Sequence, residues 1–168
     1  ESSKDNLVFA KQNAEPLLGL LNRKPELNPR HLAWICRRTL LALTLIHSKG
    51  ICHGAVTPEH LLVDGELHGI VLIDWKHAGK IDDSIVAVPK KYADMYFLEK
   101  TRKKLSTALD ISMLGSTMRR VAKDCPKKLL AFFKYMEIGR QTDAYKVDTD
   151  FKEVLVQVFG PPKWVDLD

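Results

Sequence analysis

The stretch HGAVTPEHLLVDGELHGIVLIDW, residues 53–75, contains the residues of this chain that are best suited to chemistry. Phosphoryl transfer to a hydroxyl group requires a carboxylate near the nucleophile, Mg²⁺ ligands a short distance along the chain, and a rigid support for both. A loop followed by a β-hairpin supplies that support, because paired strands hold the loop and a following Asp at a fixed separation. Asp74 comes directly after the expected hairpin and offers an intact carboxylate for a metal ion.

The order of the motifs resembles the large lobe of the protein-kinase-like fold over nearly all of residues 6–159. HGAVTPEHLLV resembles the catalytic loop H-R-D-x-K-x-x-N, LIDW resembles the strand leading into D-F-G, and ALDISMLG resembles the D-x-W-S-x-G helix. LVFAKQNAEPLLGLL likewise resembles the last small-lobe strand, the hinge and the first large-lobe helix. The HG at 53–54 and the IDW at 73–75 are also similar to the aminoglycoside and choline kinases.

Four positions keep the residue that the family pattern requires, and the resemblance implies a role for each. His53 matches the His of the catalytic loop, whose family role is structural. Asp74 matches the Asp that holds Mg²⁺ on the nucleotide phosphates. Asp110 and Gly115 match the helix that anchors the catalytic loop from below, so we expect Asp110 to be buried and to accept hydrogen bonds from that loop.

Three positions of the loop depart from the family pattern. Ala55 replaces the catalytic Asp, Thr57 replaces the loop Lys, and His60 replaces the Asn that would ligate a second Mg²⁺. The resemblance therefore predicts that the loop has no catalytic residue, and loss of a positioned base costs about 10² to 10⁴ in rate. Asp74 and His60 are candidate metal ligands. The alternatives are a structural, hydrogen-bonded His60, since Mg²⁺ prefers oxygen ligands, and an Asp74 that caps a turn.

The elements that must position these residues are mainly helical. Asn28-Pro29 predicts a helix start, and apolar residues then recur at helical spacing until Gly50 ends the pattern. HLLV and GIVLI predict two strands, with DG at 64–65 in their connection, and therefore a hairpin near residues 61–73. The remaining expected elements are a strand at 6–10, a short helix that starts near Pro16, a long loop over 76–105, and helices at 107–123, at 126–137 and within 142–159.

The expected fold is mainly α with a small β-hairpin, an α+β protein-kinase-like C-lobe whose N-lobe is largely or wholly absent. A doubly wound α/β sheet would need several more strands. No G-x-G-x-x-G and no V-A-I-K precedes the hinge, and the chain begins at Glu1 without Met, which leaves open a lobe upstream. We expect one domain over 1–168, with the small-lobe strand and hinge at 1–15, helices and the catalytic-like loop at 16–60, the hairpin at 61–75, an activation-segment-like loop at 76–105, and a helical subdomain at 106–168.

Charge, cysteine content and hydropathy argue against several classes of protein, namely disulfide-rich, zinc-knuckle and membrane-spanning proteins. The 26 Lys and Arg residues exceed the 21 Asp and Glu residues, but they occur in short scattered clusters, so nucleic-acid binding is not required. Three cysteines without a C-x-x-C pair predict a reducing, cytoplasmic location rather than a disulfide framework or a zinc knuckle. The longest apolar run, LLALTLI at 40–46, is far too short for a bilayer span, so we expect no membrane association.

These patterns predict a pseudokinase-like domain that acts as a protein-binding or regulatory scaffold. No cofactor is expected, and Mg²⁺-ATP would bind only if an upstream N-lobe completed the site. One alternative is a phosphotransferase with an atypical active site that depends on such a lobe. A second is a basic module associated with nucleic acid. The sequence names neither a protein partner nor a substrate.

Overall fold

A computed structural model describes residues 13–96 and 103–162 of the chain. The strand expected at 6–10 lies outside these residues, as does part of the long loop expected over 76–105. The described residues form a mainly helical α+β fold with small antiparallel sheets, which confirms the predicted class. None of the helices in the described ranges combines the length and the apolar character that crossing a bilayer requires.

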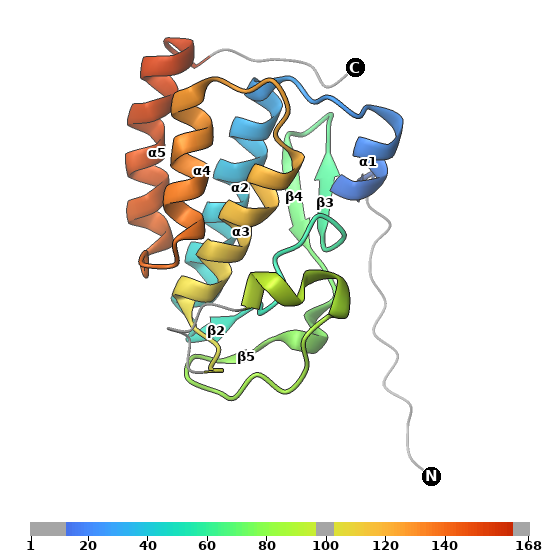
Figure 1. Ribbon diagram of the computed structural model, residues 1–168, viewed down its shortest axis with the longest axis vertical. Helices are drawn as coiled ribbons and strands as arrows, with labels where there is room; N and C mark the ends of the chain where they lie inside the picture. Colours follow the sequence, from blue (N-terminus) through green and yellow to red (C-terminus); the bar gives the residue numbers. More distant parts are fainter. Residues whose placement is uncertain (1–12, 97–102, 163–168) are drawn as a thin grey trace.

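Four long helices lie side by side and form most of the molecule (Figure 1). Each predicted helix is present, and its observed ends agree with the prediction to within three residues. Polar caps explain several starts, since the Asn28 side chain accepts a hydrogen bond from Arg30 N and the Ser106 side chain accepts one from Leu109 N. The helices are α1 Leu17–Arg23, α2 Pro29–His47, α3 Thr107–Val121, α4 Lys127–Glu137 and α5 Ala144–Phe159.

The predicted hairpin is present as β3 Leu61–Asp64 and β4 Gly69–Leu72, with Leu61 opposite Leu72 and Asp64 opposite Gly69. A short strand that was not expected, β1 Glu15–Pro16, pairs antiparallel with β3 and extends the hairpin to three strands. The sheet packs against α1 through β3 and against α2 through β4. It therefore joins the start of the described chain to the helical layer.

The loop expected over 76–105 is more structured than its composition suggests. Strand β5 Gly79–Lys80 pairs back with β2 Ile51–Cys52 as a second antiparallel sheet, and 3₁₀ segments occupy Trp75–His77 and Lys90–Tyr96. Because β2 directly precedes His53, this pairing fixes the entrance to the catalytic-like loop.

A close contact between α3 and α4 depends on Gly115. A Cβ atom at this position would lie 2.5 Å from the backbone nitrogen of Glu137 and 2.7 Å from the carbonyl oxygen of Phe133. Only glycine therefore allows the two helices to approach this closely. On α4 and α5, Phe133 and Phe151 are completely buried. The ring of Phe132 stacks on that of Phe151, with 4.7 Å between their centroids.

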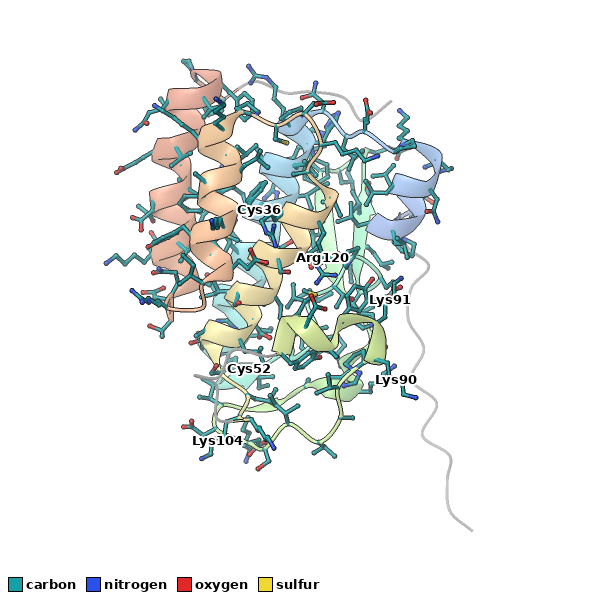
Figure 2. The ribbon with its side chains drawn as sticks, viewed as in Figure 1. Cys36, Cys52, Lys90, Lys91, Lys104 and Arg120 are labelled. Atoms are coloured by element: carbon teal, nitrogen blue, oxygen red, sulfur yellow. The ribbon has the colours of Figure 1, made fainter. Side chains whose placement is uncertain are left out.

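The basic clusters and the cysteines are spread over the fold (Figure 2). Lys91 forms an ion pair with Glu59, and Arg120 forms one with Asp94, so part of the basic charge is already compensated. Lys104 lies away from both, at the opposite edge of the loop region. The cysteines are free thiols. The described side chains therefore give little reason to expect one continuous basic face that tracks nucleic acid.

Candidate functional site

Asp110 of α3 holds the start of the catalytic-like loop. Its carboxylate is completely buried, and it accepts hydrogen bonds from His53 N and Gly54 N, each at 2.8 Å. The same oxygen that binds His53 N lies 2.9 Å from Nε2 of His47 at the end of α2. A buried carboxylate is costly unless such donors surround it. These are the burial and the loop contacts predicted for Asp110 from the sequence.

Two further hydroxyl groups hold the loop, one of them also on α3. The Thr117 hydroxyl donates to Val56 O at 2.7 Å, and the Tyr96 hydroxyl donates to Gly54 O. Burial raises the pKa of Tyr96, which keeps the hydroxyl protonated as a donor. Gly54 has a φ of +73°, and a side chain there would overlap the carbonyl oxygen of His77. The loop backbone is therefore tied to α3, to the segment before α3, and to the turn after β4.

His53 connects this loop to the end of β4. Its ring is completely buried, with Nε2 lying 3.0 Å from Ile73 O and Nδ1 accepting a hydrogen bond from Ala55 N at 3.3 Å. Since Nδ1 accepts, the neutral ring carries its proton on Nε2 and donates it to Ile73 O. Burial lowers the pKa of His53 below its ordinary value, although Asp110 opposes that shift. This neutral His53 fits the structural role implied by the resemblance.

The structure brings Ala55, His60 and Asp74 together. Ala55 is completely buried, so its methyl group is closed to any substrate, and its carbonyl oxygen lies 2.8 Å from Nδ1 of His60. The other ring nitrogen of His60 lies 3.1 Å from Oδ2 of Asp74. Both ring nitrogens of His60 thus lie beside protein oxygens. A metal ion at His60 would have to displace one of these oxygens from the ring.

Asp74 differs from Asp110 in its exposure and in its partners. Its side chain is 31% exposed, and Oδ2 also lies 2.8 Å from Nζ of Lys76. The hydrogen bond from Lys76, together with the nearby His60, holds the pKa of Asp74 below its ordinary value of 3.8. The backbone of Asp74 is left-handed, at φ 60° and ψ 60°, a conformation that Asp tolerates better than most residues. Asp74 is therefore ionised near neutral pH, and both Lys76 and His60 already contact it.

A second cluster, which the sequence analysis missed, contains His47, Cys52 and Asp110. Their ligand atoms all lie within 4.8 Å of one another, and in the described ranges this is the one group of three or more His, Cys, Asp or Glu side chains with such spacing. The residues come from α2, β2 and α3, so no local motif marks them. However, both oxygens of Asp110 accept backbone hydrogen bonds, and burial raises the pKa of Cys52 to about 12. Asp110 and His47 of this cluster are thus already engaged in the loop anchor.

The chemistry available at the front of the loop is limited. Ala55 cannot accept a proton, and the carboxylate of Asp74 is already in contact with Lys76 and His60. No protein-family model matches the sequence, and no curated protein matches it either. Function must therefore be argued from the geometry of this site.

Proposed function

We propose that this chain is a catalytically impaired protein-kinase-like domain that acts as a protein-binding or regulatory scaffold. Support comes from the order of the elements, in which a loop at 53–60, a hairpin and Asp74 are followed by the helix that carries Asp110. Support also comes from the way Asp110 binds the backbone of the loop rather than a ligand. Fold alone does not establish function, so the proposal depends on the site itself.

The observation that carries the proposal is the arrangement around His60. A phosphotransferase needs a base at the nucleophile and oxygen ligands for Mg²⁺. At the corresponding positions Ala55 is buried and Nε2 of His60 lies 3.1 Å from Oδ2 of Asp74, so there is neither a base nor a second oxygen ligand. Loss of the base alone raises the barrier by about 3 to 5.5 kcal/mol. Efficient turnover is not expected, and binding is the role that remains.

Calorimetry with Mg²⁺-ATP and a transfer assay with radiolabelled γ-phosphate test the proposal together. We expect no saturable ATP binding and no labelled product, either on the chain itself or on proteins from a cell extract. The Asp74→Ala variant is the control, because it removes the carboxylate that the resemblance assigns to Mg²⁺. Micromolar ATP binding, or phosphate transfer, that disappears in Asp74→Ala would overturn the proposal.

The ionised Asp74 favours one alternative, a phosphotransferase with an atypical active site. That function requires a Gly-rich loop and a strand Lys, which a lobe upstream of Glu1 would have to supply. It also requires that the metal ion displace His60 from Asp74. The same two assays on a longer protein that contains such a lobe decide between the two. Transfer by the longer protein that is abolished by Asp74→Ala would favour the enzyme.

A further inference from the structure

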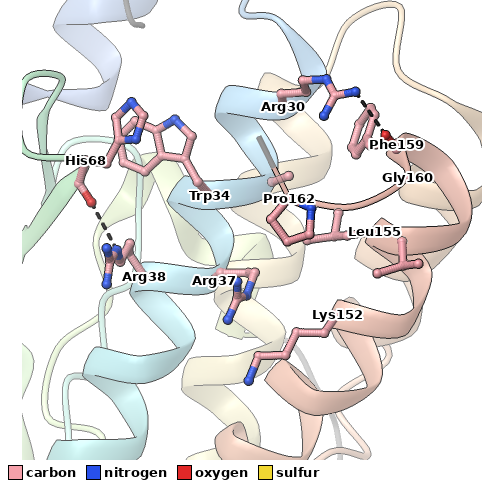
Figure 3. A pocket seen from close by; sticks show the side chains of 12 residues that line it. Arg30, Trp34, Arg37, Arg38, His68, Lys152, Leu155, Phe159, Gly160 and Pro162 are labelled. Atoms are coloured by element: carbon pink, nitrogen blue, oxygen red, sulfur yellow. Dashed lines mark hydrogen bonds between the residues drawn. The ribbon is translucent and has the colours of Figure 1, made fainter. Parts of the chain in front are cut away.

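A groove of about 620 Å³ runs between α2 and α5, and none of its lining residues belongs to the catalytic-like loop (Figure 3). Its α2 wall carries Arg30, Trp34 and Arg38, which lie along one face of the helix because they are four positions apart. Its α5 wall carries Lys152 and Phe159. The volume is in the range of known ligand sites, which is about 300 to 1,000 Å³.

Two arginines of this groove are positioned by neutral groups. Arg30 donates to Phe159 O at 3.0 Å, and its guanidinium lies 4.8 Å from the centre of the Phe159 ring. Arg38 donates through Nε to His68 O at 3.1 Å. Neither forms an ion pair with a carboxylate in residues 13–96 or 103–162. Each therefore presents a pre-oriented positive charge with guanidinium donors left for a ligand.

The end of the groove near Arg38 holds further positive charge. Arg37 and Lys152 both bind the buried carboxylate of Asp148, each at 2.9 Å. With Arg38 there are three cations and one anion at this end. Arg30 stands at the other end, beside the C-terminus of α5 (Figure 3). The groove is thus positively charged at both ends.

The centre of the groove is apolar. Trp34 stacks on the ring of His68 with 4.5 Å between centroids, which holds the indole against one wall. Leu155 and Pro162 lie opposite it, between Arg30 and Lys152 in the view of Figure 3. The surface therefore alternates cationic, apolar and cationic along its length, and charge complementarity calls for a ligand with the pattern anionic, apolar and anionic.

We propose that this groove binds an extended peptide of a partner protein with two acidic residues four positions apart and an apolar residue midway between them. Arg30 and Arg38 are eight residues apart on α2, which separates them by about 12 Å along its axis. In an extended peptide, residues i, i+2 and i+4 point to one side, and i and i+4 are about 13 Å apart. The spacings match. A single phosphate could reach only one end, so the groove favours a peptide over a mononucleotide.

The test is fluorescence anisotropy with a pool of fluorescein-labelled peptides of the form acidic-Ser-apolar-Ser-acidic, in which Asp or Glu and Leu, Ile, Val, Phe or Trp are varied. We expect saturable binding that weakens with added NaCl. Arg30→Glu and Arg38→Glu should each weaken binding by about tenfold, because each removes a charge-assisted hydrogen bond and adds repulsion. The matched control is Lys134→Glu, which makes the same charge change at an exposed position on α4 and should change affinity by less than about twofold. Thermal melts check that each variant folds.

Several outcomes would overturn the inference. No binding by any peptide in the pool, or equal weakening by Lys134→Glu, would show that the groove has no such specificity. Binding that appears only after residues 163–168 are deleted would assign the groove to the chain's own last residues. Concentration-dependent self-association that Arg38→Glu abolishes would assign it to a second copy of the chain. The inference rests on the proposed binding role, yet its failure would leave the ATP and phosphate-transfer results unchanged, so the two failures are distinguishable.

Discussion

Asp110 and Asp74 both contact the loop at 53–60, and each lies beside a histidine, but they differ in burial and in their other partners. Asp110 is completely buried, and its two oxygens receive two backbone N–H donors and approach His47. Asp74 is partly exposed, and its partners are the side chains of Lys76 and His60. One carboxylate is fixed by the backbone, whereas the other is contacted by groups that can move away.

This difference means that one carboxylate, Asp110, supports the loop, whereas the other, Asp74, is available for chemistry. Removing a buried acceptor leaves donors unsatisfied, so a residue such as Asp110 is hard to replace. Exposed ion pairs contribute little to stability, so the residues around Asp74 can change without loss of the fold. A loop supported from α3 can therefore keep its backbone position whatever side chains stand at its front, Ala55 and His60 among them. Each of the following predictions tests that separation.

Replacing Asp110 should have the largest effect on stability. Asp110→Ala leaves the N–H groups of His53 and Gly54 without an acceptor, and each buried unsatisfied donor costs about 1 to 3 kcal/mol, so we expect a loss of about 4 kcal/mol. Urea unfolding followed by circular dichroism measures the loss. The control is Glu153→Ala, which removes an exposed carboxylate from α5 and should cost less than about 0.5 kcal/mol. Equal effects of the two variants would contradict the anchoring role.

Gly54 and Gly50 form a matched pair that isolates the crowding around the loop. Their φ angles are +73° and +72°, so alanine carries the same left-handed strain of about 1 kcal/mol at either position. Nothing lies within 4 Å of a Cβ at Gly50, whereas a Cβ at Gly54 would overlap His77 O and lie 2.9 Å from Cδ2 of Leu105. We expect Gly50→Ala to cost about 1 kcal/mol and Gly54→Ala about 3 kcal/mol in urea unfolding. Similar costs would mean that the loop has room to shift.

Thr117 provides a smaller support, which an isosteric change tests. Thr117→Val keeps the volume but removes the hydroxyl that donates to Val56 O in a buried contact, so we expect a loss of about 1.5 kcal/mol. Thr149→Val is the control, because the Thr149 hydroxyl donates to Tyr145 O on the exposed face of α5. That variant should change the unfolding free energy by less than about 0.5 kcal/mol. If Thr149→Val lowers the unfolding free energy more than Thr117→Val does, the hydrogen bond from Thr117 to Val56 O does not stabilise the fold.

Local signals explain why the long elements could be predicted from the sequence. Asn28-Pro29 supplies a cap and a proline that fits the first helical turn, and α2 begins there. The two apolar runs on either side of the DG at 64–65 form the hairpin. Strands of two residues, such as β1, β2 and β5, are too short to show any alternation, so their pairing depends on tertiary contacts that no local pattern encodes.

The candidate site could be predicted only where a motif covered it. A buried Asp within an apolar helix must find donors, and the resemblance implied that the loop supplies them, so the contacts of Asp110 were predicted although its partners lie 57 and 56 positions away. Tyr96 and Thr117 were missed because no motif covers them and their partners, Gly54 and Val56, are brought near only by the fold. The groove between α2 and α5 was not predicted either, because the position of Lys152 opposite α2 depends on how α5 packs.

The smallest effect on stability should come from Asp74. Its folded pKa lies below the ordinary value of 3.8, so the ionised side chain stabilises the fold above that pH, and this stabilisation is lost as the pH falls below 3.8 through the folded pKa. Because the pair with Lys76 is exposed, solvent and salt screen it, and Asp74→Asn should lower the unfolding free energy by less than about 0.5 kcal/mol near neutral pH.

The pH and salt dependence of urea unfolding decides whether Asp74 contributes in this way. The difference between Asp74→Asn and the unchanged chain should shrink with added NaCl, because added salt screens an exposed ion pair. It should disappear as the pH falls through the folded pKa of Asp74, which lies below 3.8, because the carboxyl is then protonated and Asp and Asn differ little in charge. A loss of about 2 kcal/mol or more that persists in salt would mean that Asp74 supports the loop as Asp110 does. Asp74 would then be required for the stability of the loop, and the residues that support the loop could not be distinguished from those available for chemistry.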